Sequence, residues 1–227
     1  MTKVIIFSDN SENISSALTA LGILPVDKAA LSETDFMEIS AVYFTGSALT
    51  ADRDAVFTAI ERAHECGAAV VFDPDVRGIP EGRLDAELIN SAAAASDVFI
   101  PNLREAQLLC GAATPVDIAE HYLALGTKKV VVTLGKQGAF FKSRVESGIA
   151  PTFRAENIVD TVGAGDCFAA GLISGICEEI PLSEAVVRAN AAGSMQIQSS
   201  SESFPTMAQL REYMLSHRFV VEGCKEV

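Results

Sequence analysis

The chain alternates short apolar runs with segments in which apolar residues recur at helical spacing. Four runs rich in β-branched and aromatic residues are bounded by Gly, Pro, Asn or Asp, and they predict strands at residues 41–44, 69–72, 97–100 and 130–133. Between them, apolar residues at helical spacing before Gly67 and Gly126 predict helices that end near those glycines. Because the strands are apolar on both faces and alternate with helices, we expect a parallel sheet covered by helices on both sides, with ligands at the carboxyl ends of the strands.

The pattern changes after residue 133. Residues 138–143 and 149–153 predict a short antiparallel addition to the sheet. Helical spacing follows near residues 166–178, 183–198 and 206–217. The second half of the chain is therefore expected to end in three helices.

The first forty residues carry the weakest pattern. Lys3 to Ser8 predict one strand, Asp9 to Glu12 a polar turn, and the Leu-Pro and acidic positions after them a loop. The serine-rich residues 199–203 predict a surface loop. No internal repeat or linker divides the sequence, so we expect residues 1–227 to form a single domain.

Charge and cysteine content narrow the classes of function. Seventeen basic and thirty acidic residues give a net charge of −13, which disfavours binding to nucleic acid or to an anionic membrane. Any phosphate must therefore be bound by local geometry. No run reaches the 18 apolar residues of a membrane span, and the amino-terminal residues predict a strand rather than a signal peptide. Five dispersed cysteines without a Cys-x-x-Cys pair indicate reduced thiols, so we expect a cytoplasmic protein.

The glycine-rich segment Asp160–Asp166 carries the most informative chemistry. It precedes an apolar stretch that predicts a buried helix beginning at Gly165 or Asp166. The unpaired N–H groups and the positive dipole end of such a helix form a site for an anion. The Asp166 carboxylate then has two interpretations: a capping residue that compensates the dipole, or a catalytic base beside a bound phosphate. The local sequence leaves both open.

This segment, with the phenylalanine and glycine that follow it, resembles the second signature of the ribokinase-like (PfkB-type) carbohydrate kinases. Other motifs occur in the order of that family. Asn102–Glu105 looks like its Asn-x-x-Glu motif, and Thr133–Gly138 looks like its nucleotide loop. Asp73–Arg77 is similar to the Asp-Pro-Asn-x-Arg run of the fructokinase and ketodeoxygluconate kinase branches, with Asp75 in place of the usual Asn.

The resemblance implies a three-layer α/β/α ribokinase-like fold with a mostly parallel sheet. It also implies ATP-dependent phosphoryl transfer to a hydroxyl of a sugar or sugar acid, with Asp166 as the base. The amides of Gly163, Ala164 and Gly165 would form the anion hole for the transferring group. Positioning and electrostatics suffice for this chemistry.

The resemblance assigns the remaining binding roles as well. Asn102 and Glu105 would order Mg²⁺ through water and the phosphates, although an Asn followed three residues later by Glu is also a helix-capping pattern. The residues expected near the nucleotide are Thr133, Gly135, Gly138, Asn102 and Asn190. The residues expected near the sugar are Asp75, Arg77, Asp166, Gly46 and Ser47, and Asp160 resembles a position that helps to bind a monovalent cation such as K⁺.

The front of the family's usual chain has no counterpart in the sequence. No early Gly-Gly signature and no Asp and Asn sugar ligands are evident, so residues 1–40 are expected to be a lid or edge remnant and residues 41–217 the nucleotide-binding core. Missing strands expose sheet edges and apolar faces, which predicts a homo-oligomer, most simply a dimer. The alternative function is a non-catalytic nucleotide-binding remnant or assembly module that has lost the sugar pocket.

Overall fold

The computed structural model describes residues 2–8, 11–27, 38–79, 84–199 and 203–216. Within them, one eight-stranded sheet has the order β2-β1-β3-β4-β5-β6-β7-β8. The strands are β1 Lys3–Phe7, β2 Leu24–Asp27, β3 Ala41–Thr45, β4 Ala69–Asp73, β5 Val98–Phe99, β6 Lys129–Thr133, β7 Ala139–Ser143 and β8 Ser147–Ala150. Pairing is parallel from β2 to β6 and antiparallel for β7 and β8, so the predicted mostly parallel sheet with an antiparallel addition is confirmed.

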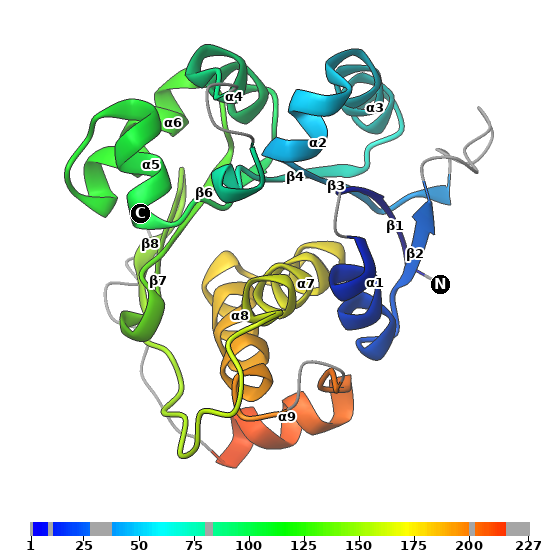
Figure 1. Ribbon diagram of the computed structural model, residues 1–227, viewed down its shortest axis with the longest axis vertical. Helices are drawn as coiled ribbons and strands as arrows, with labels where there is room; N and C mark the ends of the chain where they lie inside the picture. Colours follow the sequence, from blue (N-terminus) through cyan, green and yellow to red (C-terminus); the bar gives the residue numbers. More distant parts are fainter. Residues whose placement is uncertain (1, 9–10, 28–37, 80–83, 200–202, 217–227) are drawn as a thin grey trace.

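Helices cover both faces of the sheet and complete a three-layer α/β/α fold (Figure 1). One layer holds α2 Gly46–Ala51, α3 Arg53–Glu65, α4 Ala86–Ala94, α5 Leu103–Cys110 and α6 Pro115–Leu125. The other holds α1 Ser11–Ala20, α7 Ala164–Cys177, α8 Leu182–Gln196 and α9 Met207–Ser216. None of the helices in the described ranges is long and apolar enough to cross a membrane.

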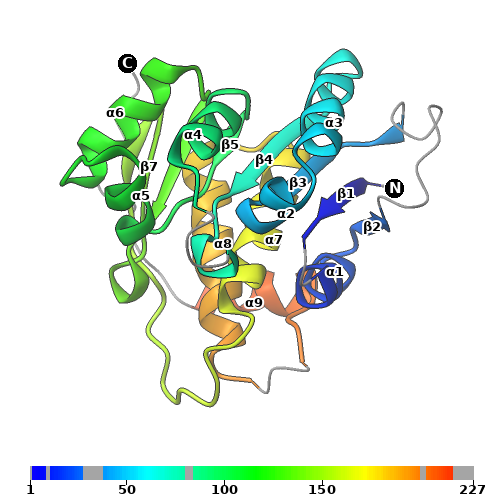
Figure 2. The ribbon, with the colours of Figure 1, turned by 45° about the horizontal axis from the view of Figure 1, so that its top comes forward.

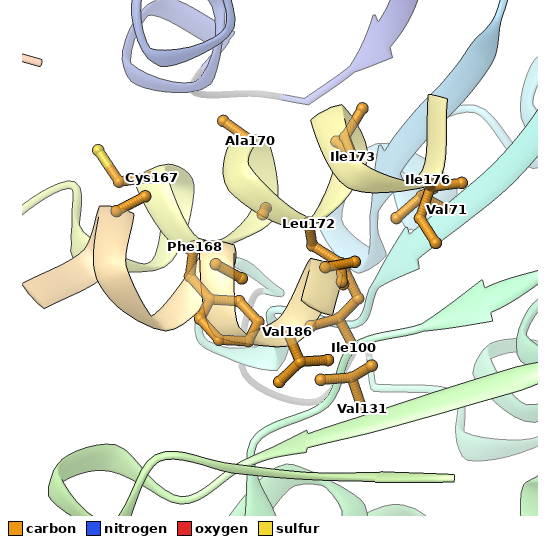
Figure 3. Packing of buried hydrophobic residues seen from close by; sticks show 14 of the residues in the cluster. Val71, Ile100, Val131, Cys167, Phe168, Ala170, Leu172, Ile173, Ile176 and Val186 are labelled. Carbon is orange, nitrogen blue, oxygen red and sulfur yellow. The ribbon is translucent and has the colours of Figure 1, made fainter. Parts of the chain in front are cut away.

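The helix α7 is the centre of one of the two hydrophobic cores. Leu172 of α7 points toward Ile100 and Val186 of α8 in the same cluster, which also contains Val131 of β6, and Ile176 lies near Val71 of β4 (Figure 3). The two helices approach closely because α7 carries glycines at the contact. A methyl group added at Gly175 would come within 2.6 Å of the Ala185 Cβ. This close packing fixes where the amino terminus of α7 lies relative to the sheet.

The hairpin between β7 and β8 also helps to hold α8. The Glu146 carboxylate accepts hydrogen bonds from the backbone N–H groups of Leu182, at 2.7 Å, and Ser183, at 3.2 Å. Pro181 at the N-cap offers no side-chain hydrogen bond of its own, so Glu146 supplies the missing cap from another element.

The amino-terminal part differs from its prediction. The strand predicted at residues 3–8 is present as β1, and it is an internal strand of the main sheet between β2 and β3 (Figure 2). Half of the expected turn, residues 9 and 10, lies outside the described residues, and its other half begins α1, whose Ile14 and Leu18 are fully buried. The expected Leu-Pro loop forms β2, in which Pro25 is tolerated because β2 is an edge strand.

The later predictions agree more closely. The three carboxyl-terminal helices are confirmed, with α7 beginning at Ala164, slightly earlier than expected. The strand expected at residues 149–153 begins and ends earlier, at Ser147 and Ala150. Most of the serine-rich segment 199–203 lies outside the described residues.

Candidate functional site

A cavity of about 690 Å³ opens at the carboxyl ends of β4, β5 and β6. This is the edge of a parallel sheet at which ligands bind, because the following loops and helix termini converge there. Most of the site residues predicted from the sequence line it. They are Asp75, Arg77, Asn102, Glu105, Thr133, Gly135, Gly138, Ala164, Gly165 and Asn190.

The amino terminus of α7 forms one wall of the cavity. Gly163 is the N-cap residue with φ 79°, a left-handed conformation that glycine adopts without a steric cost. The Ala164 N–H contacts the Thr161 carbonyl at 3.4 Å, whereas the amides of Gly165 and Asp166 have no partner within the described ranges. These two N–H groups and the positive end of the helix dipole are suited to an anion, whereas the Ala164 amide, which was expected to take part, already contacts a carbonyl.

Asp166 is the third residue of α7, and its side chain lies beside the cavity rather than in its lining. Burial raises the pKa of the Asp166 carboxyl from 3.8 to about 6, and the negative charge of Asp75 adds to the increase. A hydrogen bond from the Asn13 side chain and the positive charge of Arg77 lower this pKa in part. A carboxyl group with a pKa of about 6 is ionised at neutral pH and is still basic enough to take a proton.

Asn102 and Glu105 form a helix capping box at the start of α5. The Asn102 Oδ1 accepts a hydrogen bond from the Glu105 N–H at 2.9 Å, and the Glu105 Oε2 accepts one from the Asn102 N–H at 3.0 Å. The structural interpretation of this motif is therefore correct. Glu105 is only 5% exposed, and burial raises the pKa of its carboxyl, yet it lines the cavity. The capping role thus holds a carboxylate at the wall of the site.

The loop after β4 adds two further carboxylates and one cation. Asp75 has φ 26° and ψ 59°, and its N–H donates to the Asp73 Oδ1 at 3.1 Å. The Arg77 Nε lies 3.3 Å from the Asp75 Oδ1. Asp73 also lines the cavity, and burial, followed by the charges of Glu105 and Asp75, raises the pKa of its carboxyl.

Of the polar residues on this wall, Glu105 with Asn102 would hold a divalent cation through water and phosphate. The charges of Glu105 and Asp75 raise the pKa of Asp73, and the charge of Asp75 raises the pKa of Glu105, which indicates an excess of negative charge on one wall. Among the described side chains, no group of three or more His, Cys, Asp and Glu residues could hold a metal ion. Mg²⁺ keeps several waters and takes few protein ligands, so the donor set suits Mg²⁺ carried by a nucleotide.

The opposite wall contains the loop after β6 and a side chain of α8. Gly138 has φ 89°, and a methyl group there would lie 2.0 Å from the Ala150 carbonyl oxygen, so this turn requires glycine. Asn190 is 5% exposed and donates a hydrogen bond to the same carbonyl at 2.8 Å. Asn190 therefore has a structural role between α8 and β8 and also lines the cavity.

Known proteins resemble this chain in sequence. A model of the pfkB family of carbohydrate kinases matches residues 3–208. The chain belongs to this family. It is 37% identical over 178 residues to the 2-dehydro-3-deoxygluconokinase of Bacillus subtilis, which covers 76% of this chain and 55% of the relative. It is 30% identical over 205 residues to the 5-dehydro-2-deoxygluconokinase of Geobacillus kaustophilus, which covers 86% of this chain and 61% of that relative.

Solved structures of pfkB-type proteins have the same fold. A PfkB protein from Polaromonas sp. JS666 superposes with a TM-score of 0.69 at 31% identity and covers 81% of this chain and 60% of that one. A putative ribokinase II from E. coli in complex with ATP and Mg²⁺ gives a TM-score of 0.71 at 26% identity, with coverage of 82% and 62%. This pfkB-family chain therefore spans about 55 to 62% of the length of the relatives compared here.

Besides Asp166, four predicted residues lie outside the cavity lining of this pfkB-family chain. Gly46 packs against the loop after β4, because a Cβ there would lie 2.0 Å from the Pro74 carbonyl oxygen. Ser47 is buried next to Thr45, with 2.9 Å between their hydroxyl oxygens. The Asp160 Oδ1 accepts the Val162 N–H at 3.0 Å and closes a turn, and the fourth residue is the N-cap glycine of α7 described above.

Two polar residues of the site were missed by the sequence analysis. Asp73 ends β4 in a run that the analysis quoted, and its place at a strand end was the available signal. Asn13 lies in a segment expected to adjoin a turn, and its local sequence gives no indication of a contact with Asp166. The contact exists because α1 packs along α7.

Proposed function

We propose that this protein transfers a phosphoryl group from ATP to a hydroxyl group of a sugar acid. The observation that carries the proposal is the position of Asp166 in the first turn of α7, where the amides of Gly165 and Asp166 have no partner among the described residues and Gly165 lines a cavity at the carboxyl edge of the sheet. A base and an anion site then share one helix terminus, which is the arrangement that in-line transfer to a hydroxyl requires.

In this mechanism the Asp166 carboxylate takes the proton of the acceptor hydroxyl as the hydroxyl oxygen attacks the terminal phosphorus of ATP, and the bond from that phosphorus to the bridging oxygen breaks to release ADP. The Gly165 and Asp166 amides hold the oxygens of the transferring group, where negative charge develops. The bound divalent ion would neutralise phosphate charge, and Glu105 and Asn102 would hold it through water. General-base action of this kind contributes about 10² to 10⁴ in rate.

The acceptor is expected beside β1 and β3. The chain passes from β1 to β2 in one direction and from β3 to β4 in the other, which makes the position between β1 and β3 the topological switch point of the sheet. Asn13, in the helix after β1, reaches Asp166 there. A sugar acid is favoured because the two relatives named above are a 2-dehydro-3-deoxygluconokinase and a 5-dehydro-2-deoxygluconokinase, and because the exposed Arg77 guanidinium can pair with a carboxylate.

One observation favours the alternative of a non-catalytic nucleotide-binding module. The Asn13 side chain already occupies a hydrogen-bonding position on the Asp166 carboxylate. If an acceptor cannot displace or share this contact, the base cannot reach a substrate hydroxyl. Dimer formation and binding of a monovalent cation at Asp160 remain predictions.

A coupled assay of ADP release tests the proposal. The purified protein is supplied with Mg·ATP and, in separate reactions, 2-dehydro-3-deoxygluconate, hexoses, pentoses and nucleosides. We expect turnover on the sugar acid. Binding of Mg·ATP without turnover on any acceptor would support the non-catalytic alternative, and sedimentation of the same sample would establish the oligomeric state.

A further inference from the structure

We propose that Asp73 is a positioning residue, which sets the backbone conformation of Asp75 and thereby the acceptor side of the site. This inference rests on the proposed function. It assigns Asp73 and Tyr43 a role in acceptor binding through Asp75, without contact between either residue and a substrate.

The chain of contacts begins inside the sheet. Tyr43, on β3, is 2% exposed, and its phenol hydroxyl hydrogen-bonds the Asp73 carboxyl at the end of the neighbouring strand β4. The Asp73 Oδ1 then accepts the backbone N–H of Asp75 at 3.1 Å.

The residue that Asp73 holds has an unusual backbone. Asp75 has a positive φ of 26°, a region that residues other than glycine rarely occupy. Such a conformation persists only where surrounding contacts over-determine it, and these residues cluster at functional sites. In the described ranges, Glu179 is the other non-glycine residue with positive φ, and it follows the last turn of α7, where left-handed residues commonly end helices. The Asp75 conformation has no such helix-ending explanation.

The conformation of Asp75 affects the candidate base, Asp166. The Asp75 carboxylate raises the pKa of Asp166, and Arg77, which pairs with Asp75 at 3.3 Å, lowers it. If the Asp75 backbone relaxed to an ordinary conformation, both charges would move relative to Asp166. The anion site at α7 and the Gly138 turn belong to other elements and would remain in place. We therefore expect loss of the Asp73 acceptor to affect the sugar and to spare ATP.

The kinetic test compares three variants in the ADP-release assay with 2-dehydro-3-deoxygluconate as acceptor. Asp73→Ala removes the oxygen that holds Asp75 and is expected to raise KM for the acceptor at least tenfold, with KM for ATP within twofold of the wild type. Asp73→Asn keeps an oxygen acceptor of the same shape and is expected to stay within threefold on both. Tyr43→Phe removes only the phenol hydroxyl that hydrogen-bonds Asp73, and it is expected to raise KM for the acceptor by a smaller factor than Asp73→Ala does. An unchanged acceptor KM in Asp73→Ala, or equal losses in Asp73→Ala and Asp73→Asn, would overturn the proposal.

Crystal structures of the same variants give a readout that does not need turnover. We expect the φ of residue 75 to stay positive in Asp73→Asn and to become negative in Asp73→Ala. A positive φ in Asp73→Ala refutes the positioning role even if the wild-type protein proves inactive. If Asp73→Ala does not fold, Tyr43→Phe decides: an acceptor KM and a residue 75 conformation both identical to the wild type would overturn the proposal. Inactivity of the wild type on every acceptor, with the expected change of φ, would instead count against the proposed function alone.

Discussion

The Asn13 side chain hydrogen-bonds the Asp166 carboxylate and so joins α1 to the first turn of α7. The two residues are far apart in the sequence. They meet because α1 and α7 pack side by side on one face of the sheet. This contact opposes the effect of burial on the pKa of Asp166. The amino-terminal segment therefore tunes the group that we propose as the base.

The pH dependence of activity is the first prediction. Because burial raises the pKa of Asp166 to about 6, kcat/KM is expected to rise with pH through about 6 and to be level above it. Asp166→Asn is expected to bind ATP as well as the wild type does, while turnover drops at least a hundredfold. The measurements are pH–rate profiles and titration of ATP by calorimetry. Unchanged turnover in Asp166→Asn would exclude this residue as the base.

The same shift predicts a pH-dependent stability. The pKa of Asp166 is higher in the folded state than its ordinary value of 3.8, so the protonated side chain favours folding below pH 3.8 and this contribution is lost as pH rises through about 6. Asp166→Asn mimics the protonated form. Its stability relative to the wild type is therefore expected to be greater at pH 8 than at pH 4, by up to about 3 kcal/mol. Urea unfolding at both pH values measures the gain, and an identical difference at both would contradict it.

Substitution of Asn13 gives a further prediction about the pKa of Asp166. Its hydrogen bond lowers the pKa of Asp166, so Asn13→Ala is expected to move the midpoint of the pH–rate profile upward by about half a unit or more. Asn13→Asp adds a like charge and is expected to move it further. The exposed neighbour Glu12 provides the control, because Glu12→Gln should leave the midpoint in place. A downward shift in Asn13→Ala would show that the contact does not stabilise the ionised carboxylate.

The sequence predicted the centre of the sheet because its strands are buried on both faces and consist of uninterrupted apolar residues, as in Val70 to Phe72. The same reasoning failed at α1 and β2. Ser11 and Asn13 are as typical of turns as of helix starts, and Pro25 is typical of loops, although an edge strand tolerates it. The amphipathic spacing of Ile14 and Leu18 was the signal available for α1.

The candidate site was predictable where one short segment contains the whole feature. The α7 amino terminus and the Gly138 turn are such segments, since their backbone geometry follows from local glycines. The contacts of Asp73 with Tyr43 and of Asn13 with Asp166 join separate elements. They depend on the order of strands and on helix packing, which no local pattern specifies.

Gly165 yields a prediction in which stability and binding change in opposite directions. A methyl group at Gly165 would meet no atom within 4 Å, and alanine favours a helix by about 0.5 to 1 kcal/mol over glycine. Gly165→Ala is therefore expected to raise Tm. It is also expected to weaken ATP binding at least tenfold, because the methyl group would project into the space in which we place the phosphates.

The matched control lies in the same helix. A methyl group at Gly175 would come within 2.6 Å of the Ala185 Cβ, so Gly175→Ala is expected to lower Tm by overpacking the contact with α8. Gly175 does not line the cavity, and ATP affinity should stay within twofold. Thermal unfolding measures Tm and calorimetric titration measures ATP affinity for both variants. Full ATP affinity in Gly165→Ala would place the phosphates elsewhere.

Substitution of Glu105 tests the two roles that the sequence left open for the Asn102–Glu105 motif, helix capping and the ordering of Mg²⁺. Glutamine also completes a capping box, so Glu105→Gln is expected to keep the start of α5 and to change the free energy of unfolding by less than about 1 kcal/mol. Loss of the carboxylate should nevertheless raise the Mg²⁺ concentration for half-maximal activity at least tenfold, since the charge that attracts the ion is gone. Glu120→Gln, which removes only a surface ion pair with Lys142, serves as the control. A Mg²⁺ dependence in Glu105→Gln equal to that of the control would leave Glu105 with the capping role alone.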